Sequence, residues 1–336
     1  MTDQTGITRL ATGYGQGPTV TREAPWVGIG VKGHWTDYRD ALNAAQLGFT
    51  VEQKEMFWQK DVLPNKFTPG IFNATVTVNE PTPMMANVRS DTQEALGYVT
   101  TQYGIIQNED AFALLEPFTR VGGVITNAGM TEQGLCFMVL RMQQTKFLGD
   151  YYDFDVMCCN SFNTKFPLSL IMVPTRIICQ NMYRKLMGNN DSILHLRHAS
   201  HADNRLKAAN AAVNAIDSYV TAFGLSVEKA ADKYMDSTEY TKLVELLFPY
   251  PKPGNPREQM TKDKVDKMRV EFYDRYYMAP DNVKFHRTGM GFLNAYYDFL
   301  SHRDPGKNMP GSWEDRRLSS LVSGSSIKPK IIQACM

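Results

Sequence analysis

The order of strand-like and helix-like segments constrains the fold of this chain most strongly. Runs rich in β-branched and aromatic residues, separated by glycines and prolines, predict strands at 74–79, 84–90, 96–106, 122–130, 134–142, 151–163, 168–173 and 192–198. From residue 202 onward apolar residues recur with helical spacing, which predicts helices at 202–223, 226–236, 238–248, 258–278 and 288–301. Strands that precede helices, with short connections between the strands, predict an α+β protein with an antiparallel sheet.

Composition divides the chain into regions. The expected regions are a flexible N-terminal arm at 1–24, an α+β core domain at 25–200, a helical region at 201–304 and a peripheral tail at 305–336. Within the core domain, helices at 36–46 and 109–120 are expected to pack on the sheet, and Pro81-Thr82-Pro83 is expected to form a turn.

The charge of the chain is distributed unevenly. The whole chain has a formal charge of only +1, which excludes a uniformly basic protein. The segment from Lys165 to Lys207 contains seven basic and two acidic residues, a net charge of +5. The segment from Val78 to Leu135 contains two basic and seven acidic residues, a net charge of −5. Opposite charges on one subunit favour head-to-tail association, so we predict a homo-oligomer, either a ring or a filament. The alternative is that the two segments cancel each other within the fold.

Composition also bounds the location of the protein. No apolar run approaches the roughly 20 residues that cross a bilayer, so no membrane association is expected. The first residues lack a basic segment followed by an apolar one, which argues against a secretory signal. The five cysteines are odd in number and four lie in apolar surroundings, which predicts reduced, buried thiols in the cytoplasm of a host cell.

The segment Pro174 to Lys185 has the pattern of a short amphipathic helix with a basic face. At 3.6 residues per turn, Arg176, Tyr183 and Arg184 share one side, while apolar residues occupy the other. Two guanidinium groups beside a tyrosine suit a phosphate backbone or a stacked base. The predicted nucleic-acid-binding residues are these three together with Lys165, Lys185, Arg197, His198, Arg205 and Lys207. An ordinary solvated helix face is the alternative.

Aromatic residues also lie next to basic ones elsewhere in the chain. One instance is Phe147 next to Lys146, and Tyr151-Tyr152 follow shortly after it. Another is the aromatic stretch at 272–277, which surrounds Arg275. Interleaved aromatic and cationic side chains suit single-stranded nucleic acid, because bases stack on the rings while the cations neutralise phosphates. The aromatic residues at 272–277 are expected to belong mainly to a helix-packing core.

Three patterns suggest enzymatic or cofactor chemistry, and each has a simpler explanation. Asp150, Asp153 and Asp155 could serve a metal-dependent nuclease, but solvated acids at the start of a strand fit as well. The GxGxxG pattern at 28–33 lacks the surrounding βαβ unit of a dinucleotide site. Of the histidines at 195–201, His195 and His198 fall on the predicted strand at 192–198 and point to opposite faces, which does not direct them to one metal. We therefore predict no cofactor, no bound metal and no catalytic residue.

Several short motifs occur in a fixed order from residue 25. They are Pro25-Trp26-Val27-Gly28-Ile29-Gly30, residues 37–51, Leu96-Gly97-Tyr98-Val99, residues 103–112, Asn160-Ser161-Phe162-Asn163, residues 174–181, residues 205–209 and residues 317–324. In order and spacing they resemble the phage/plasmid-like family of domains of unknown function, number 932. Phe162-Asn163 stands where that family has His-Asp, which weakens any acid–base role of this turn.

The resemblance implies a phage, prophage or plasmid origin but no assigned activity. The core of the family is similar in outline to phage single-strand annealing proteins of the Erf and RecT type, which bind single-stranded DNA and form rings or filaments. We therefore expect a strand-annealing recombination protein that binds single-stranded DNA without nucleotide hydrolysis. The expected partners are single-stranded DNA, further copies of this chain and a phage nuclease. A metal-dependent nuclease and a phage structural or assembly protein are the alternatives.

Overall fold

The computed structural model describes most of the chain. The described residues are 23–62, 76–184, 186, 192–196, 202–254, 257–303, 311–324 and 328–336. Of the expected N-terminal arm at 1–24, only the last two residues fall within this part.

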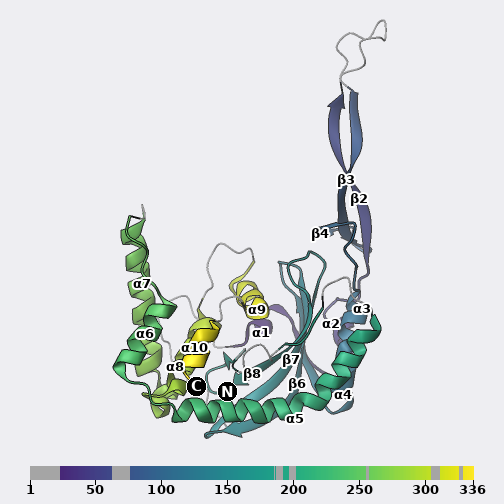
Figure 1. Ribbon diagram of the computed structural model, residues 1–336. Helices are drawn as coiled ribbons and strands as arrows, with labels where there is room; N and C mark the ends of the chain where they lie inside the picture. The colour runs from purple at the N-terminus through teal and green to yellow at the C-terminus, as the bar shows by residue number, and fades with distance from the viewer. Residues whose placement is uncertain are drawn as a thin grey trace, which may run out of the picture.

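A seven-stranded antiparallel sheet forms the centre of the molecule (Figure 1). Its strands are β1 (Val31–Trp35), β5 (Val124–Met130), β6 (Leu135–Phe147), β7 (Asp150–Ser161), β8 (Leu168–Arg176), β9 (Asn181–Met182) and β10 (Ser192–Leu196). The order is β1-β5-β6-β7-β8-β10, and the short β9 pairs with β8. Consecutive strands are mostly neighbours, as short connections require. The predicted α+β class and antiparallel pairing are confirmed.

A second, three-stranded sheet extends far from the first as a long β-hairpin (Figure 1). It contains β2 (Val51–Val62), β3 (Val76–Arg89) and β4 (Ala95–Thr100). The turn predicted at Pro81-Thr82-Pro83 is wrong, because β3 continues through it. A register shift accommodates the prolines: Phe57 lies opposite Pro81, whereas Glu55 lies opposite Met85. Such a bulge relieves prolines of ladder hydrogen bonds that they cannot donate.

Short helices lie near the start of the described residues and in the connections between the two sheets. They are α1 (Pro25–Ile29), α2 (Tyr38–Ala44), α3 (Asn108–Phe112), the 3₁₀ turn η1 (Ala113–Leu115) and α4 (Glu116–Arg120). Asp37 caps α2, since its carboxylate accepts a hydrogen bond from the Arg39 amide at 2.8 Å. In the GxGxxG segment, Gly30 lies against β5, where an added Cβ would approach the Ala128 carbonyl oxygen to 2.5 Å. The glycine therefore permits close packing.

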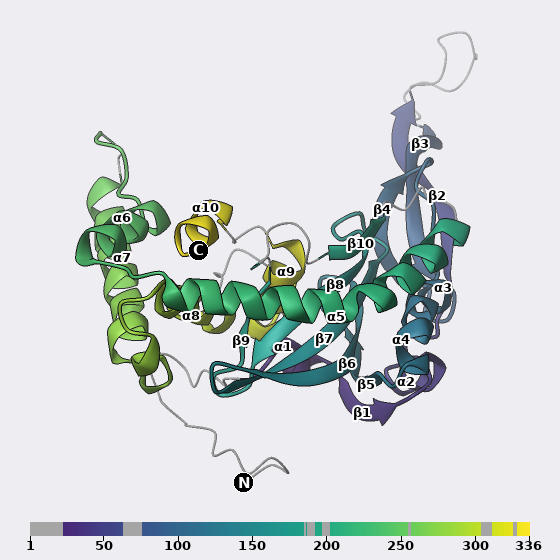
Figure 2. The same ribbon diagram turned by 60° about the horizontal axis from the view of Figure 1, so that its bottom comes forward.

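One long helix, α5 (Ala202–Asp232), spans the base of the molecule (Figure 2). It replaces two helices that the sequence predicted separately. Its buried residues recur every three or four positions, which is the spacing of one helix face, and they include Ile216, Val220 and Phe223. Phe223 packs on Tyr152 and Phe154 of β7, with ring centroids 5.4 and 5.3 Å apart. The helix thereby covers one face of the seven-stranded sheet.

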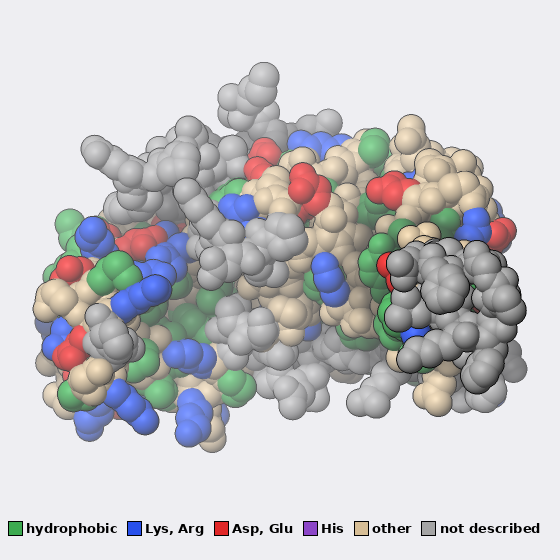
Figure 3. Space-filling view, turned by 90° about the horizontal axis from the view of Figure 1, so that it is seen from above, with side chains coloured by type: hydrophobic (Ala, Val, Ile, Leu, Met, Phe, Trp, Pro, Cys, Tyr) green, Lys and Arg blue, Asp and Glu red, His purple; other side chains and the backbone are tan. Residues whose placement is uncertain are grey.

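The chain then forms a helical arm at the opposite end from the hairpin (Figure 1). Its elements are α6 (Ser237–Leu247), α7 (Glu258–Tyr273), the π-helical turn η3 (Asp274–Met278), the 3₁₀ turn η4 (Pro280–Phe285) and α8 (Gly289–His302). An aromatic core holds the arm together, and in it Phe272 and Tyr276 are buried, as the sequence predicted for 272–277. Seen from above in Figure 3, the described surface of the arm mixes hydrophobic, basic and acidic side chains.

The described part of 305–336 is not a peripheral tail, contrary to the prediction. It contains α9 (Trp313–Ser323) and α10 (Pro329–Ala334). Leu318, Ile331 and Cys335 are completely buried. The helix α9 lies on α1 and covers, with Trp26, part of the sheet face opposite α5. The sequence did not predict these two helices, because they are short and follow a Gly- and Pro-containing segment.

A buried asparagine network joins the two sheets. Asn160 at the end of β7 donates to the Ile106 carbonyl at 2.9 Å and to Asn108 Oδ1 at 3.1 Å. Asn87 of β3 donates to the Phe162 carbonyl at 2.7 Å. Several family-like motifs therefore serve structure here, and Phe162-Asn163 supply neither a histidine nor a carboxylate to the turn after β7.

We expect Asn160→Ala to lower the free energy of unfolding by at least about 1–3 kcal/mol, because it leaves two buried acceptors without their donor. Urea denaturation measures this loss. Asn79→Ala, at an exposed position of the hairpin, is the control and should change stability by less than about 0.5 kcal/mol. Equal stability of the two variants would contradict the role assigned to the network.

Candidate nucleic-acid interface

The basic helix predicted over Pro174 to Lys185 is wrong. Residues up to Arg176 continue strand β8, a turn occupies 177–180, and β9 pairs back so that Asn181 lies opposite Arg176. Gln180 adopts a left-handed conformation with φ of 55°, which ends any helical path at this point. The apolar residues that suggested a helix, such as Cys179 and Met182, are buried as expected, but in a hairpin.

Arg176 is fully buried and belongs to a salt-bridge network. Its Nη2 lies 2.7 Å from Asp150 Oδ2, and its Nη1 lies 3.2 Å from Asp281 Oδ2. It also donates to the Asp281 backbone carbonyl at 2.7 Å. Lys284 contacts the second oxygen of Asp150 at 2.7 Å. The guanidinium thus fastens the sheet to η4 and cannot contact a nucleic acid in this structure.

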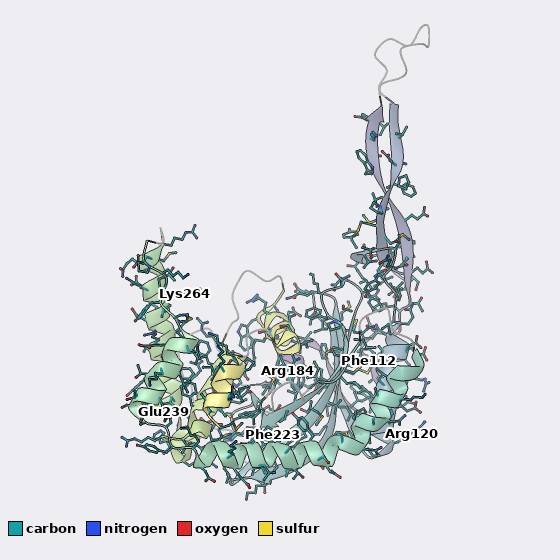
Figure 4. All side chains as sticks on the ribbon, in the orientation of Figure 1. Phe112, Arg120, Arg184, Phe223, Glu239 and Lys264 are labelled. Atoms are coloured by element: carbon teal, nitrogen blue, oxygen red, sulfur yellow. The ribbon has the colours of Figure 1, made fainter. Side chains whose placement is uncertain are left out.

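Tyr183 and Arg184 are buried as well. The Tyr183 hydroxyl donates to Asn294 Oδ1 of α8 at 2.6 Å, and its ring packs on Tyr297 with centroids 4.8 Å apart. Burial raises the pKa of the Tyr183 phenol, which keeps it protonated as a donor. Arg184 lies beside α9, as Figure 4 shows, and donates to the Leu321 and Val322 carbonyls at the end of that helix. Arg176, Tyr183 and Arg184, which were predicted to bind nucleic acid, are therefore core residues.

The other predicted binding residues divide into two groups. Lys165, in the connection from β7 to β8, and Lys207, on α5, are exposed. Lys185, Arg197 and His198 lie outside the described residues, as does the side chain of Arg205. The net charge of +5 from Lys165 to Lys207 consequently overstates the surface charge, because Arg176 and Arg184 are internal.

The acidic cluster does not form a metal site in this structure. Asp153 and Asp155 alternate with Phe154 and face the side of the sheet opposite α5, whereas Asp150 turns toward Arg176. Arg141 binds both Asp153 and Asp155, at 2.9 and 3.0 Å. Across the described part of the chain, no group of three or more His, Cys, Asp or Glu side chains could hold a metal ion. The five cysteines are free and buried, as predicted.

A polar cavity of about 400 Å³ opens on the sheet face opposite α5. Its volume lies within the range of about 300–1,000 Å³ that is usual for ligand sites. The lining comes from α1 and strands β1, β5, β6, β7 and β8, and includes Trp26, Lys32, Thr126, Asn127, Arg141, Gln144, Asp153, Asp155, Thr175 and Gln180. The cavity exists because α1 and α9 cover only the apolar half of this face, where Phe137, Val139 and Val173 lie.

The cavity offers hydrogen-bond donors and acceptors together. Gln144 donates to Asp153 Oδ1 at 2.9 Å, so Arg141 and Gln144 order the two carboxylates. Burial raises the pKa of the Asp155 carboxyl, and the Arg141 guanidinium counteracts this. Asn127 is 5% exposed, and its side-chain nitrogen has no hydrogen-bond partner in the structure. A buried donor of this kind is costly unless a ligand or water satisfies it.

An aromatic–cation pair extends the cavity along the same sheet face. Gln144 lies opposite Asp153, and two residues further Lys146 lies opposite Tyr151, so all four side chains point to one side. Lys146 Nζ lies 5.2 Å from the centre of the Tyr151 ring, which is 39% exposed. The sequence analysis noted Lys146 beside Phe147, and Tyr151 beside Tyr152, but did not predict this cross-strand pair. We call Lys32, Lys146, Tyr151 and the cavity between them the open sheet face.

The family model for "Domain of unknown function (DUF932)" matches residues 95–322, which is more than half of the chain. The chain belongs to the DUF932 family. In this DUF932 protein the matched region runs from β4 to α9 and includes Arg141, Lys146 and Tyr151, while Trp26 and Lys32 precede it. Searches of curated proteins and of solved structures gave no match. Within the described residues no helix is both long and apolar enough to cross a membrane.

Proposed function

We propose that this DUF932 protein binds single-stranded DNA and anneals complementary strands, as a phage or plasmid recombination protein in the host cytoplasm. It acts without nucleotide hydrolysis and is not an enzyme. Its partners are single-stranded DNA, further copies of the chain in a ring or filament, and a phage nuclease. The sequence resemblance supports this proposal by analogy, because it implies a core similar in outline to Erf and RecT annealing proteins.

The open sheet face is the observation that carries the proposal. Tyr151 provides an exposed ring on which a base can stack, with Lys146 beside it to neutralise a phosphate. Lys32 provides a second exposed cation on the other side of the cavity. Between them, Asn127 and Gln144 present amide groups suited to the edge of a base. A strand held mainly through phosphates keeps its remaining bases available for pairing.

The geometry does not favour the nuclease alternative. A two-metal site needs carboxylates that converge on ions about 3.5–4 Å apart. Here Asp150 and Asp153 point to different sides of β7, and each already binds a cationic side chain. Rearranging them would deprive Arg176 of Asp150, one of its two buried partners, which is energetically costly.

A gel shift with single-stranded DNA, with and without magnesium, tests the proposal. We expect a retarded, intact strand in both conditions, and faster annealing of two complementary strands in a fluorescence assay. Cleavage in magnesium would instead support the nuclease. Absence of both binding and cleavage would support a phage structural or assembly protein.

Tyr151→Ala should weaken single-stranded DNA binding by about 1–3 kcal/mol, or about 5- to 150-fold in Kd, because a stacked base loses its ring. Fluorescence anisotropy with a labelled oligonucleotide measures the change. Tyr234→Ala is the matched control, since Tyr234 is exposed but lies two residues after the end of α5. If both variants bind like the parent, the strand does not stack on Tyr151.

Replacing Lys32 and Lys146 together by alanine should reduce the slope of log K against log salt by about 1.4. Each lost phosphate contact on a single strand contributes roughly 0.7 to this slope. Lys207→Ala, on the helix that covers the other sheet face, should leave the slope unchanged. A larger effect of Lys207 than of the pair would place the strand elsewhere.

A further inference from the structure

Two groups of exposed hydrophobic side chains lie at opposite ends of the molecule. The hairpin patch consists of Trp58, Val78 and Tyr98. The arm patch, on α6, α7 and the residues next to them, consists of Leu246, Tyr250, Met260, Val270 and Tyr273. Single exposed hydrophobic residues are normal, but clusters on projecting elements mark interaction sites.

The hairpin patch is presented by a two-stranded ribbon. Trp58 pairs with Glu80, and Lys60 pairs with Val78, so Trp58 and Val78 lie on the same face, two residues apart along the ribbon. Trp58 is 49% exposed and Tyr98 is 61% exposed. Beyond the end of β4, no described element covers this face. The ribbon has few neighbours of its own to stabilise it, so a partner that covers the patch also stabilises the hairpin.

The arm patch is presented by the outer side of α7. Met260 and Val270 are 63% and 62% exposed, and Lys267 lies between them on the same side of the helix. The opposite side of α7, with Val265 and Phe272, faces the core of the arm. The exposed hydrophobic side chains are therefore not needed to hold α7 in place.

The charges around the two patches are complementary. The described residues of the hairpin sheet, 51–62 and 76–100, contain three basic and six acidic residues, a net −3. The described residues 237–254, 257–278 and 328–336, which include α6, α7, η3 and α10, contain ten basic and seven acidic residues, a net +3 that falls to +2 without the buried Arg275. In Figure 3 the arm shows basic groups interspersed with hydrophobic ones and with fewer acidic ones. Opposite net charges steer two such surfaces together and fix their register.

The two patches cannot meet within one molecule, because α5 and the seven-stranded sheet separate the hairpin from the arm (Figure 1). We propose that the hairpin patch of one copy docks on the arm patch of the next copy. This contact is head-to-tail, so each copy keeps one hairpin and one arm for its two neighbours, and repetition gives a ring or a filament. The inference specifies the interface of the homo-oligomer in the proposed function and rests on it.

The test uses two double variants of the full chain. The hairpin variant carries Trp58→Thr and Tyr98→Thr, and the arm variant carries Met260→Gln and Val270→Gln. Threonine suits strands and glutamine suits helices, and all four positions are exposed, so folding should be preserved. Equal melting temperatures for parent and variants verify this. Leu225→Gln, which removes a 61% exposed hydrophobic side chain from α5, is the matched control.

Light scattering at low salt measures the masses. We expect the parent and the Leu225 control to exceed two chains, and each double variant alone to fall to one chain. An equimolar mixture of the two double variants should form dimers and nothing larger, because one intact hairpin then meets one intact arm. A self-complementary interface would pair hairpin with hairpin or arm with arm. Mixing the two variants would then not combine an intact hairpin with an intact arm in one contact.

The proposal is overturned if the parent is a monomer with and without single-stranded DNA, if either double variant keeps the parent's mass, or if the mixture remains monomeric. A gel shift on the same samples separates this result from the proposed function. Monomeric variants that still bind single-stranded DNA leave DNA binding intact. An assembled parent that fails to bind DNA would overturn DNA binding while leaving the interface in place.

Discussion

Arg176→Ala is expected to lower the free energy of unfolding by about 3–5 kcal/mol, the usual cost of removing one partner from a buried ion pair. The guanidinium lies between Asp150 and Asp281, at 2.7 and 3.2 Å. Lys284 can still pair with Asp150, but Asp281 loses the cation that the structure shows beside it. Urea denaturation of parent and variant at neutral pH measures the loss.

Two further variants sharpen this test. Arg176→Lys should be intermediate, because a single ammonium group retains the charge but not the fork that reaches both carboxylates. Lys207→Ala, at an exposed position, should change stability by less than about 0.5 kcal/mol. An Arg176→Ala variant with the parent's free energy of unfolding but weaker single-stranded DNA binding would contradict the buried position of Arg176 and would indicate that its side chain contacts the ligand.

Tyr183→Ala is expected to destabilise the protein by about 3–5 kcal/mol, as for other large aromatic residues removed from a core. Its ring is completely buried and contacts the rings of Tyr152, Phe223 and Tyr297. These neighbours belong to β7, α5 and α8, so the substitution opens a cavity where sheet and helices meet. Thermal and urea denaturation both report the change.

Tyr183→Phe separates the ring from the hydroxyl. It keeps the packing and leaves Asn294 Oδ1 without its donor, for a cost of about 1–3 kcal/mol. Tyr151→Ala on the open sheet face is the matched control and should alter stability by no more than about 0.5 kcal/mol while weakening DNA binding. Stability losses of equal size at Tyr183 and Tyr151 would contradict the assignment of one to the core and the other to the surface.

The sequence by itself determined the fold class and most of the elements. The strands from Val124 to Val173 and the helices from 202 to 302 lie close to the predicted positions, because period-2 and helical patterns are properties of consecutive residues. The buried, free cysteines followed from their apolar neighbours in the sequence. Lys146 and Tyr151 were each noted within aromatic and basic stretches, but their pairing across β6 and β7 was not predicted.

The tertiary structure alone decided which side chains are buried. Arg176 has its acidic partners 26 and 105 residues away, so no local pattern shows that its charge is neutralised inside the protein. The apolar spacing at 174–182 suggests a helix, but the segment forms a hairpin. It does so because β7, from Tyr152 onward, provides a strand with which β8 pairs. The cavity, likewise, exists only where α1 and five strands meet. Pairing, burial and charge neutralisation between distant segments depend on the folded chain, and these decide which cations and aromatic rings can reach a ligand.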